Sequence, residues 1–280
     1  MERDKKEVVL ITGASSGIGK STANFLREEG FIVYAASRRI DRMEDLKAKG
    51  IKVLGLDLTN EDSITGCVDH VISETGVIDV LINNAGYGFF GSLEDVPLSE
   101  AKRQFEVNLF GAGRLMQLIL PHMRKQGAGK IINITSTGGI YATPFGGWYQ
   151  STKFALEGLS DALRMDVARF GIDVIIIEPG AVESEWTSIA LDHLLKVSSM
   201  PYAKAAEKVV KSMEKSYAHA SDPVVIARVI KKAIDSKKPR TRYAAGRYAK
   251  PTLLLRSLVT DRQLDRFFLK MLGIYGKDSD

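Results

Sequence analysis

Cysteine is almost absent from this 280-residue sequence, in which Cys67 is the single representative. One cysteine cannot form an intrachain disulfide framework or a cysteine-based zinc site, and its scarcity fits a reducing compartment. Histidines are also few, at positions 70, 122, 193 and 219, and none stands in a spacing typical of a metal site. The sequence therefore predicts no bound metal ion.

Long apolar segments are missing as well. No run approaches the roughly 18 apolar residues that a membrane span requires, and the segment Met1 to Glu7 is charged, unlike a signal peptide. We therefore expect a cytoplasmic protein. A strong charge of one sign is also lacking, because the net charge is +5 and basic residues are interleaved with acidic ones. This pattern predicts no nucleic-acid partner.

What the sequence does contain is an alternation of short apolar runs and amphipathic segments. The apolar runs are predicted to be buried strands and cover residues 8–12, 31–36, 51–56, 80–82, 130–135 and 173–177. Six βα units of this kind predict an α/β protein with a doubly wound parallel sheet, the Rossmann fold. We expect a single domain over residues 1–280, with residues 241–245 as a candidate seventh strand.

The last third of the chain departs from this alternation. Residues 183–199 are predicted to be irregular, and residues 183–222 together to form a substrate loop or lid. Residues 245–280 are predicted to be a helical C-terminal extension that covers the pocket or contacts another subunit. Contact with a membrane surface is the weaker alternative, because Asp261 and Asp265 mix the charge of its polar face.

A glycine-rich turn separates the first strand from the first helix. It reads Gly13-Ala14-Ser15-Ser16-Gly17-Ile18-Gly19, with the spacing G-x-x-x-G-x-G. Glycines let the backbone approach a pyrophosphate, and the N-terminus of the following helix attracts the anion. We interpret the turn as a dinucleotide-binding site; the alternative is a tight turn with a structural role alone.

The ends of the next two strands indicate which dinucleotide binds. NAD-binding folds usually place an acid about 20 residues beyond the glycines, but this chain has Ser37-Arg38-Arg39 there. Two guanidinium groups suit the 2′-phosphate of NADP(H), although they could also be an exposed charge pair at a helix start. After the third strand, Asp57 is a candidate contact for the adenine amino group or else a cap of the next helix.

Tyr149 and Lys153 stand four residues apart and therefore share one face of a helix. A phenol titrates near pH 10, and an ammonium beside it would favour the phenolate and lower its pKa. The two residues are thus a candidate acid/base pair. Earlier in the chain, Asn83 and Asn84 follow the fourth strand, where their side chains are expected to tie neighbouring strands together.

These segments in order resemble the short-chain dehydrogenase/reductase family over roughly residues 8–186. The resemblance is carried by the glycine turn, Asn83-Asn84-Ala85-Gly86, Asn108, Ser136 standing 13 residues before Tyr149, Lys153, and Pro179-Gly180. A looser similarity links the C-terminal extension, Trp148-Tyr149 and Glu185-Trp186 to the branch that contains hydroxysteroid and retinol dehydrogenases.

The family resemblance implies a catalytic tetrad. In it, Tyr149 is the general acid in reduction and the general base in oxidation, and Lys153 lowers its pKa and holds the nicotinamide ribose. Ser136 binds the substrate oxygen, and Asn108 holds a water that links Lys153 to solvent.

The coenzyme-binding residues implied by the motifs and the resemblance form a longer list: Gly13, Ser15, Ser16, Gly17, Ile18, Gly19, Arg38, Arg39, Asp57, Leu58, Asn84, Ala85, Gly86, Tyr149, Lys153, Pro179, Gly180, Val182 and Ser184. Two positions depart from the family pattern. Ser184 stands where a threonine is frequent, and Ser16 where NADP(H)-dependent members often carry a basic residue. The preference for NADP(H) over NAD(H) therefore rests on Arg38 and Arg39.

The sequence thus predicts an NADP(H)-dependent oxidoreductase that interconverts a carbonyl and a secondary alcohol. Side chains on predicted loops beyond the strand ends favour an apolar steroid-, retinoid- or lipid-like substrate, unless they only pack a lid: Phe89, Phe90, Tyr141, Trp148, Val182 and Trp186. An NADP(H)-binding sensor without turnover is the main alternative. A nucleotide-sugar epimerase is disfavoured, because the G-x-x-G-x-x-G turn is lacking. The helices predicted at 99–125 and 149–170 are expected to pair in a homodimer or homotetramer.

Overall fold

The computed structural model describes residues 6–274. Within them a seven-stranded sheet runs in the order β3-β2-β1-β4-β5-β6-β7, and every neighbouring pair is parallel. The strands are β1 (Val8–Thr12), β2 (Ile32–Ser37), β3 (Lys52–Gly55), β4 (Val80–Asn83), β5 (Gly129–Ile134), β6 (Ile172–Pro179) and β7 (Arg242–Ala245). The predicted α/β fold, its single domain and its seventh strand are confirmed.

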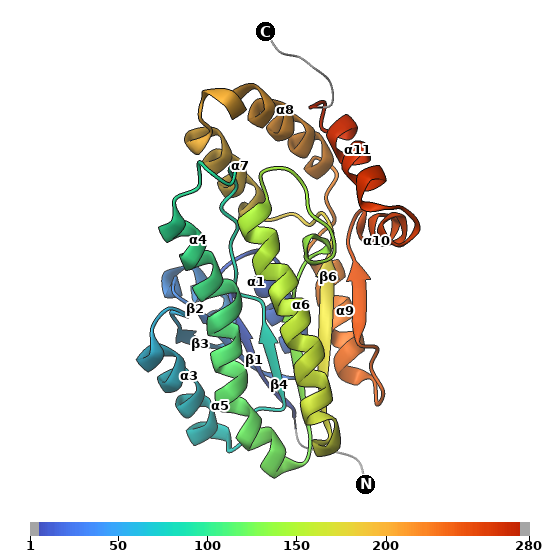
Figure 1. Ribbon diagram of the computed structural model, residues 1–280. Helices are drawn as coiled ribbons and strands as arrows, with labels where there is room; N and C mark the ends of the chain where they lie inside the picture. The colour runs from blue at the N-terminus through green and yellow to red at the C-terminus, as the bar shows by residue number, and fades with distance from the viewer. Residues whose placement is uncertain (1–5, 275–280) are drawn as a thin grey trace.

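Helices cover both faces of this sheet (Figure 1). They are α1 (Gly17–Glu28), α2 (Glu44–Ala48), α3 (Glu61–Thr75), α4 (Leu98–Phe105), α5 (Gly111–Gln126), α6 (Gly147–Val167), α7 (Glu185–Val197), α8 (Met200–Tyr217), α9 (Val224–Asp235), α10 (Ala249–Leu258) and α11 (Asp261–Met271). The central strands β1 and β4 read as near-continuous apolar runs because both of their faces are buried. One core lies under α1 and α9, and the other lies under α3 and α5.

The strand order reverses next to β1, which pairs with β2 on one side and with β4 on the other. The chain crosses to opposite faces of the sheet on the two sides of this strand, so the connections diverge and leave a crevice at its carboxyl end. The glycine turn begins at this point, directly after Thr12. The topology of the sheet alone therefore puts the predicted coenzyme site at the carboxyl end of β1.

The long helix predicted over residues 99–125 is interrupted. A π-helical turn at Glu106–Phe110 joins α4 to α5, and it contains the buried Asn108. Such turns widen a helix locally and are frequent at functional sites. Asn108 is a polar residue within the otherwise apolar stretch Val107–Phe110, so its burial here requires hydrogen-bond partners.

The prediction that residues 183–199 are irregular is wrong, because α7 spans Glu185–Val197. Its buried residues include Ala190, Leu191 and Leu194, and they pack against Val209 on α8 in a third apolar cluster. The spacing of these residues is helical, so burial of one stripe explains the element. Figure 1 shows α7 and α8 together beyond one end of the sheet, with α11 beside them.

The C-terminal extension forms α10 and α11, and Phe268 of α11 stacks on Tyr141 with ring centroids 5.0 Å apart. The extension therefore packs against the loop that leads into α6. None of the helices in residues 6–274 has the length and apolar character to span a membrane. Residues 1–5 and 275–280, which carry part of the predictions on the N-terminal segment and the extension, lie outside the described residues.

Candidate active site

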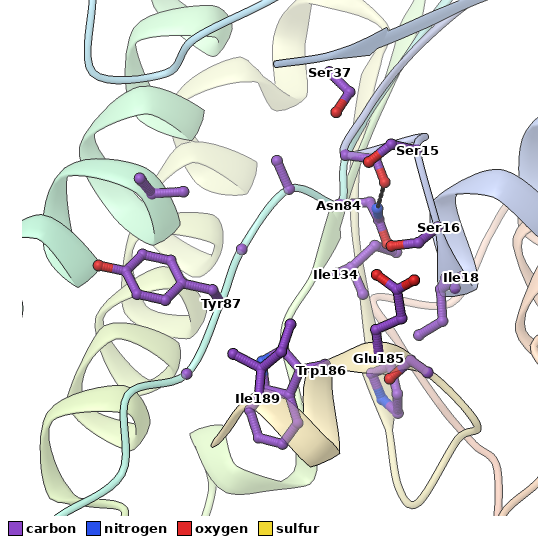
Figure 2. A pocket seen from close by; sticks show the side chains of 18 of the residues that line it. Ser15, Ser16, Ile18, Ser37, Asn84, Tyr87, Ile134, Glu185, Trp186 and Ile189 are labelled. Atoms are coloured by element: carbon purple, nitrogen blue, oxygen red, sulfur yellow. Dashed lines mark hydrogen bonds between the residues drawn. The ribbon is translucent and has the colours of Figure 1, made fainter. Parts of the chain in front are cut away.

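A cavity of about 450 Å³ opens at the carboxyl ends of the strands, and Figure 2 shows side chains that line it. Its lining includes all the predicted coenzyme and catalytic residues except Gly19 and Asn108. These two residues act from behind the cavity wall. A Cβ at Gly19 would lie 2.4 Å from the carbonyl oxygen of Gly13, so this glycine permits close packing inside the turn.

The glycine turn forms one wall of the cavity and could hold a phosphate. Gly13 has φ +68°, and a Cβ there would lie 2.7 Å from the Cα of Ala85, so no other residue fits without displacing the backbone. Asn84 braces the turn by donating from Nδ2 to the carbonyl oxygen of Thr12 at 2.9 Å. The side chain of Ser16 makes no capping bond at the start of α1. First-turn amides of a helix lack intrahelical partners, and their positive end attracts an anion.

The amide side chains that follow β4 link neighbouring strands, as predicted. Asn83 donates from Nδ2 to Oδ1 of Asn133 on β5 at 2.9 Å, while Asn84 reaches Thr12 at the end of β1. Small residues come next in the chain, and the cavity lining includes Ala85 and Gly86. These contacts fix the edge of the sheet against which a ligand would lie.

Arginines gather at the end of β2, where NADP(H) binding was predicted. Arg39 donates to Oγ of Ser15 from Nε at 3.3 Å and from NH2 at 3.1 Å, and NH2 also lies 3.3 Å from Oγ of Ser16. Its side chain is therefore held against the glycine turn. Arg38 is exposed, and both arginines line the cavity. The corner is a cationic site beside the turn.

Asp57 is directed toward its own turn. Its Oδ1 accepts hydrogen bonds from N and Oγ1 of Thr59, at 3.0 and 2.8 Å, and Asn60 caps α3 instead. Burial acts to raise the pKa of Asp57, but the Thr59 bonds and the charge of Arg38 outweigh it, so this pKa is lowered. The prediction that Asp57 caps α3 is therefore wrong. Its carboxylate still lines the cavity, and its contact with adenine stays a prediction.

Tyr149 and Lys153 lie in the first two turns of α6 and line the cavity together with Ser136. Nζ of Lys153 donates to the carbonyl oxygen of Ile134 at 2.9 Å and lies 6.0 Å from the centroid of the Tyr149 ring. The Ser136 side chain hydrogen-bonds to the phenol and also accepts from the amide of Gly138 at 3.0 Å. Three of the four side chains predicted to catalyse the reaction are thus brought together.

The electrostatics of this pair differ from the prediction. Burial raises the pKa of the Tyr149 phenol well above its usual value, and the bond with Ser136 offsets this only in part. Burial also lowers the pKa of Lys153 to about 8, opposed by the charge of Glu157 one helical turn further on. The predicted lowering of the Tyr149 pKa by Lys153 is therefore not found in the protein alone. The reason is that desolvation penalises both charged forms.

Asn108 bridges two parts of the site. Its Oδ1 accepts from the amide of Tyr87 at 3.0 Å, and its Nδ2 donates to the carbonyl oxygen of Tyr87 at 2.8 Å and to Oγ1 of Thr152 at 3.1 Å. A Cβ added to Gly86 would lie 3.1 Å from Oδ1 of Asn108 and 3.6 Å from Nζ of Lys153. Asn108 thus holds the loop after β4 against α6 beside Lys153. Its predicted role in holding a water stays a prediction.

The apolar side chains predicted to meet the substrate divide into two groups. Val182 and Trp186 line the cavity, whereas Phe89, Phe90, Tyr141 and Trp148 do not. Phe90 packs edge-on against Trp186, with ring centroids 5.6 Å apart. The ring centroids of Trp186 and Tyr149 also lie 4.9 Å apart. Most of these aromatics therefore pack around the catalytic helix and α7, as the alternative interpretation held.

Sequence reasoning missed several residues of the cavity. Ser37, Leu56 and Thr135 lie at strand ends, so the rule that ligands bind at the carboxyl edge could have found them. Glu185 and Tyr217 enter from α7 and α8; Glu185-Trp186 contributed only to the looser branch resemblance, and no motif marks Tyr217. Burial raises the pKa of Tyr217 to about 12, so it remains neutral. Among residues 6–274, no cluster of histidine, cysteine or carboxylate side chains could hold a metal ion.

Comparison with known proteins decides the family. Residues 7–194 match the short chain dehydrogenase family profile, which is more than half of the chain. The protein belongs to the short-chain dehydrogenase family. It is accordingly an oxidoreductase that depends on a pyridine nucleotide.

Individual relatives agree with this assignment. A 3-ketodihydrosphingosine reductase of Bacteroides thetaiotaomicron is 38% identical over 240 residues, which cover 86% of this chain and 88% of that protein. The crystal structure of a short-chain dehydrogenase from Streptomyces avermitilis has a TM-score of 0.80 at 32% identity, covering 99% of this chain and 100% of that one. An NAD⁺-bound xylitol dehydrogenase has a TM-score of 0.75 at 27% identity, covering 88% and 99%.

Proposed function

We propose that this enzyme uses NADP(H) to interconvert a ketone and a secondary alcohol on an apolar substrate. One observation carries the proposal: the cavity that contains the glycine turn and the two arginines also contains Tyr149, Lys153 and Ser136. Groups suited to phosphate and groups suited to proton transfer thus share one space. A site that transfers a hydride from a dinucleotide needs this combination.

The residues fit such a coenzyme. Gly13 and Gly19 permit the tight packing that shapes the turn, and the start of α1 would attract the charge of a pyrophosphate beside it. Lys153 would hold the nicotinamide ribose, and Pro179-Gly180, Val182 and Ser184 the carboxamide end. When bound, the nicotinamide ring supplies or accepts the hydride.

Proton transfer falls to Tyr149. Its raised pKa keeps the phenol protonated at neutral pH, which suits donation to a carbonyl oxygen during reduction. Ser136, which already bonds the phenol, would stabilise the charge that develops on that oxygen. In the reverse direction the phenol must lose its proton. The positive charges of Lys153 and of an oxidised nicotinamide favour that loss.

The preference for NADP(H) is supported by Arg38 and Arg39, which line the cavity at the end of β2 with no acid beside them on that strand. A planar guanidinium binds a phosphate through two parallel hydrogen bonds. Arg39 is already oriented by Ser15 and Ser16. The structure of the similar xylitol dehydrogenase is NAD⁺-bound. We therefore base the choice between NADP(H) and NAD(H) on Arg38 and Arg39 of this chain and not on the family.

An apolar substrate is supported by Val182, Trp186 and Ile189, which line the cavity. The name of the Bacteroides relative, a 3-ketodihydrosphingosine reductase, favours a lipid-like ketone. The proposal also includes steroids and retinoids, on which members of the loosely similar hydroxysteroid and retinol dehydrogenase branch act. We also propose that residues 183–222 act as the lid and that α10 and α11 support it.

Assembly with a second copy is part of the same proposal. Apolar side chains stand exposed on the outer faces of the π-helical turn and α6, where Phe110 is 57% exposed and Met165 is 70% exposed. Phe154 and Leu159 are exposed on the same helix. Exposed apolar groups on neighbouring elements mark interaction surfaces. They support a homodimer or homotetramer that pairs through α5 and α6.

The test is a coenzyme-oxidation screen that compares NADPH with NADH over long-chain keto lipids, steroids, retinoids and simple ketones. We expect turnover with at least one apolar ketone and higher kcat/KM with NADPH. Higher kcat/KM with NADH would refute the role of the arginines. Tight NADPH binding without turnover across the panel would instead favour a coenzyme-binding protein without catalytic activity.

A further inference from the structure

Glu185, the first residue of α7, contacts Arg39, which follows β2, and Arg42, which lies in the 3-10 turn Ile40–Met43 after it. Its Oε1 and Oε2 lie 2.9 and 2.8 Å from NH1 of Arg42, and Oε2 lies 3.4 Å from NH1 of Arg39. These partners are 143 and 146 residues away in the chain. Figure 2 shows the Glu185 side chain pointing toward the glycine turn that carries Ser15 and Ser16. A segment predicted to be irregular thus delivers a carboxylate to the coenzyme site.

Arg39 is engaged from two sides. Its Nε and NH2 donate to the serine hydroxyls of the glycine turn, and its NH1 faces Glu185. A 2′-phosphate that binds Arg39 must share this guanidinium with the carboxylate and must approach a like charge. A ribose that carries only hydroxyls meets no such repulsion. Arg42 holds the carboxylate of Glu185 in this corner, where its negative charge would face a 2′-phosphate bound to Arg39.

We propose that Glu185 sets the coenzyme selectivity of this enzyme, by competing with the 2′-phosphate of NADP(H) for Arg39. The inference rests on the proposed binding of that phosphate by Arg38 and Arg39. The end of β2 lacks the acid that lowers phosphate affinity in NAD-dependent folds. Here the carboxylate comes from α7 instead. The enzyme would then have only a moderate preference for NADP(H), because the arginines attract the 2′-phosphate and the carboxylate of Glu185 repels it.

The competing pair is partly open to solvent, with the Arg39 side chain 43% exposed and that of Glu185 50% exposed. Screening limits the interaction between such groups to a modest size. We expect neutralisation of Glu185 to tighten NADPH binding by roughly 3- to 10-fold. The gain should shrink as ionic strength rises, because the repulsion is electrostatic.

The experiment measures dissociation constants of NADPH and NADH by fluorescence titration of the full chain. The variant is Glu185→Gln, which keeps the shape of the side chain. The matched control is Glu183→Gln, which removes the same charge two residues before Glu185. The Glu183 side chain is exposed and contacts neither arginine. Glu185→Gln should tighten NADPH binding and leave NADH binding within about twofold. Glu183→Gln should change neither.

A second pair of variants separates the two proposals. Arg39→Ala should weaken NADPH binding, and Glu185→Gln should have a smaller effect in that background, because the contested guanidinium is gone. If Arg39→Ala leaves NADPH affinity unchanged, the proposed coenzyme site itself is wrong. If Arg39→Ala weakens NADPH binding but Glu185→Gln does not tighten it, only the present inference fails. Equal weakening of both coenzymes by Glu185→Gln would also overturn it and would show that the ion pair holds α7 in place.

Discussion

The substitution Tyr149→Phe separates catalysis from stability in this enzyme. The ring contacts survive the change, because Phe90 and Trp186 pack against the Tyr149 ring with centroids 5.8 and 4.9 Å away. The loss is one hydroxyl and its bond with Ser136. A buried hydrogen bond contributes about 1 kcal/mol, so we expect the folded state to be maintained and coenzyme affinity to be preserved.

The expected effect on the rate is much larger. Removal of a positioned general acid costs about 10²- to 10⁴-fold, which corresponds to about 3 to 5 kcal/mol in the activation barrier. The assay follows the oxidation of NADPH with the best ketone from the screen, alongside thermal unfolding and coenzyme titration of the same preparation. The loss should fall on kcat, because the phenol acts in the transition state.

The matched control is Tyr34→Phe. Tyr34, on β2, is also fully buried and does not line the cavity, and its hydroxyl donates to Oε2 of Glu74 at 2.5 Å. This variant should lose similar stability and keep wild-type turnover. The reasoning is refuted if Tyr149→Phe keeps more than about a tenth of the wild-type kcat, or if Tyr34→Phe loses as much activity.

Three further predictions follow from packing and charge. Lys153 has a pKa of about 8 in the folded protein, against an ordinary value of 10.5. Between these two pH values the unfolded chain binds more protons than the folded protein. The free energy of unfolding therefore rises by about 3 kcal/mol as pH rises from the lower value to the higher one. Lys153→Met should abolish this rise in denaturant titrations, raise the melting temperature at neutral pH and eliminate turnover; an unchanged pH slope would contradict the assignment. Gly19→Ala should destabilise the fold by about 2 kcal/mol or more and weaken coenzyme binding, because its Cβ meets the Gly13 carbonyl oxygen at 2.4 Å. The control is Gly66→Ala on α3, where an added Cβ meets open space and should stabilise the fold by about 0.5–1 kcal/mol. Equal shifts of the melting temperature in the Gly19 and Gly66 variants, measured by calorimetry, would contradict this reasoning. Phe110→Glu should dissociate the proposed assembly in light scattering, and an unchanged mass would refute pairing through this face.

The predictable part of the site was the part encoded locally. The glycine turn is a continuous segment between a strand and a helix, and Tyr149 and Lys153 are one helical turn apart, so their proximity follows from backbone geometry. Ser136 could be added only through the family resemblance, because its meeting with Tyr149 depends on how β5 and α6 pack.

The unpredicted part was long-range. The helical character of α7 was missed, although its apolar residues have helical spacing, because the segment lacks strong boundary signals. The pKa of Tyr149 was predicted in the wrong direction, because sequence shows which charges are nearby but not how deeply a group is buried.

The sequence by itself determined the parallel α/β fold, the family and the candidate catalytic side chains, because hydrophobic periodicity and short motifs act over a few residues. Only the tertiary structure decided what surrounds those side chains. It brought Glu185 from α7 to Arg39 and closed the cavity with Tyr217 from α8. It also buried Tyr149 and Lys153 away from water, with Tyr149 packed against Phe90 and Trp186. Desolvation and contacts between distant segments arise only when the chain is packed, and they set the electrostatics of this site.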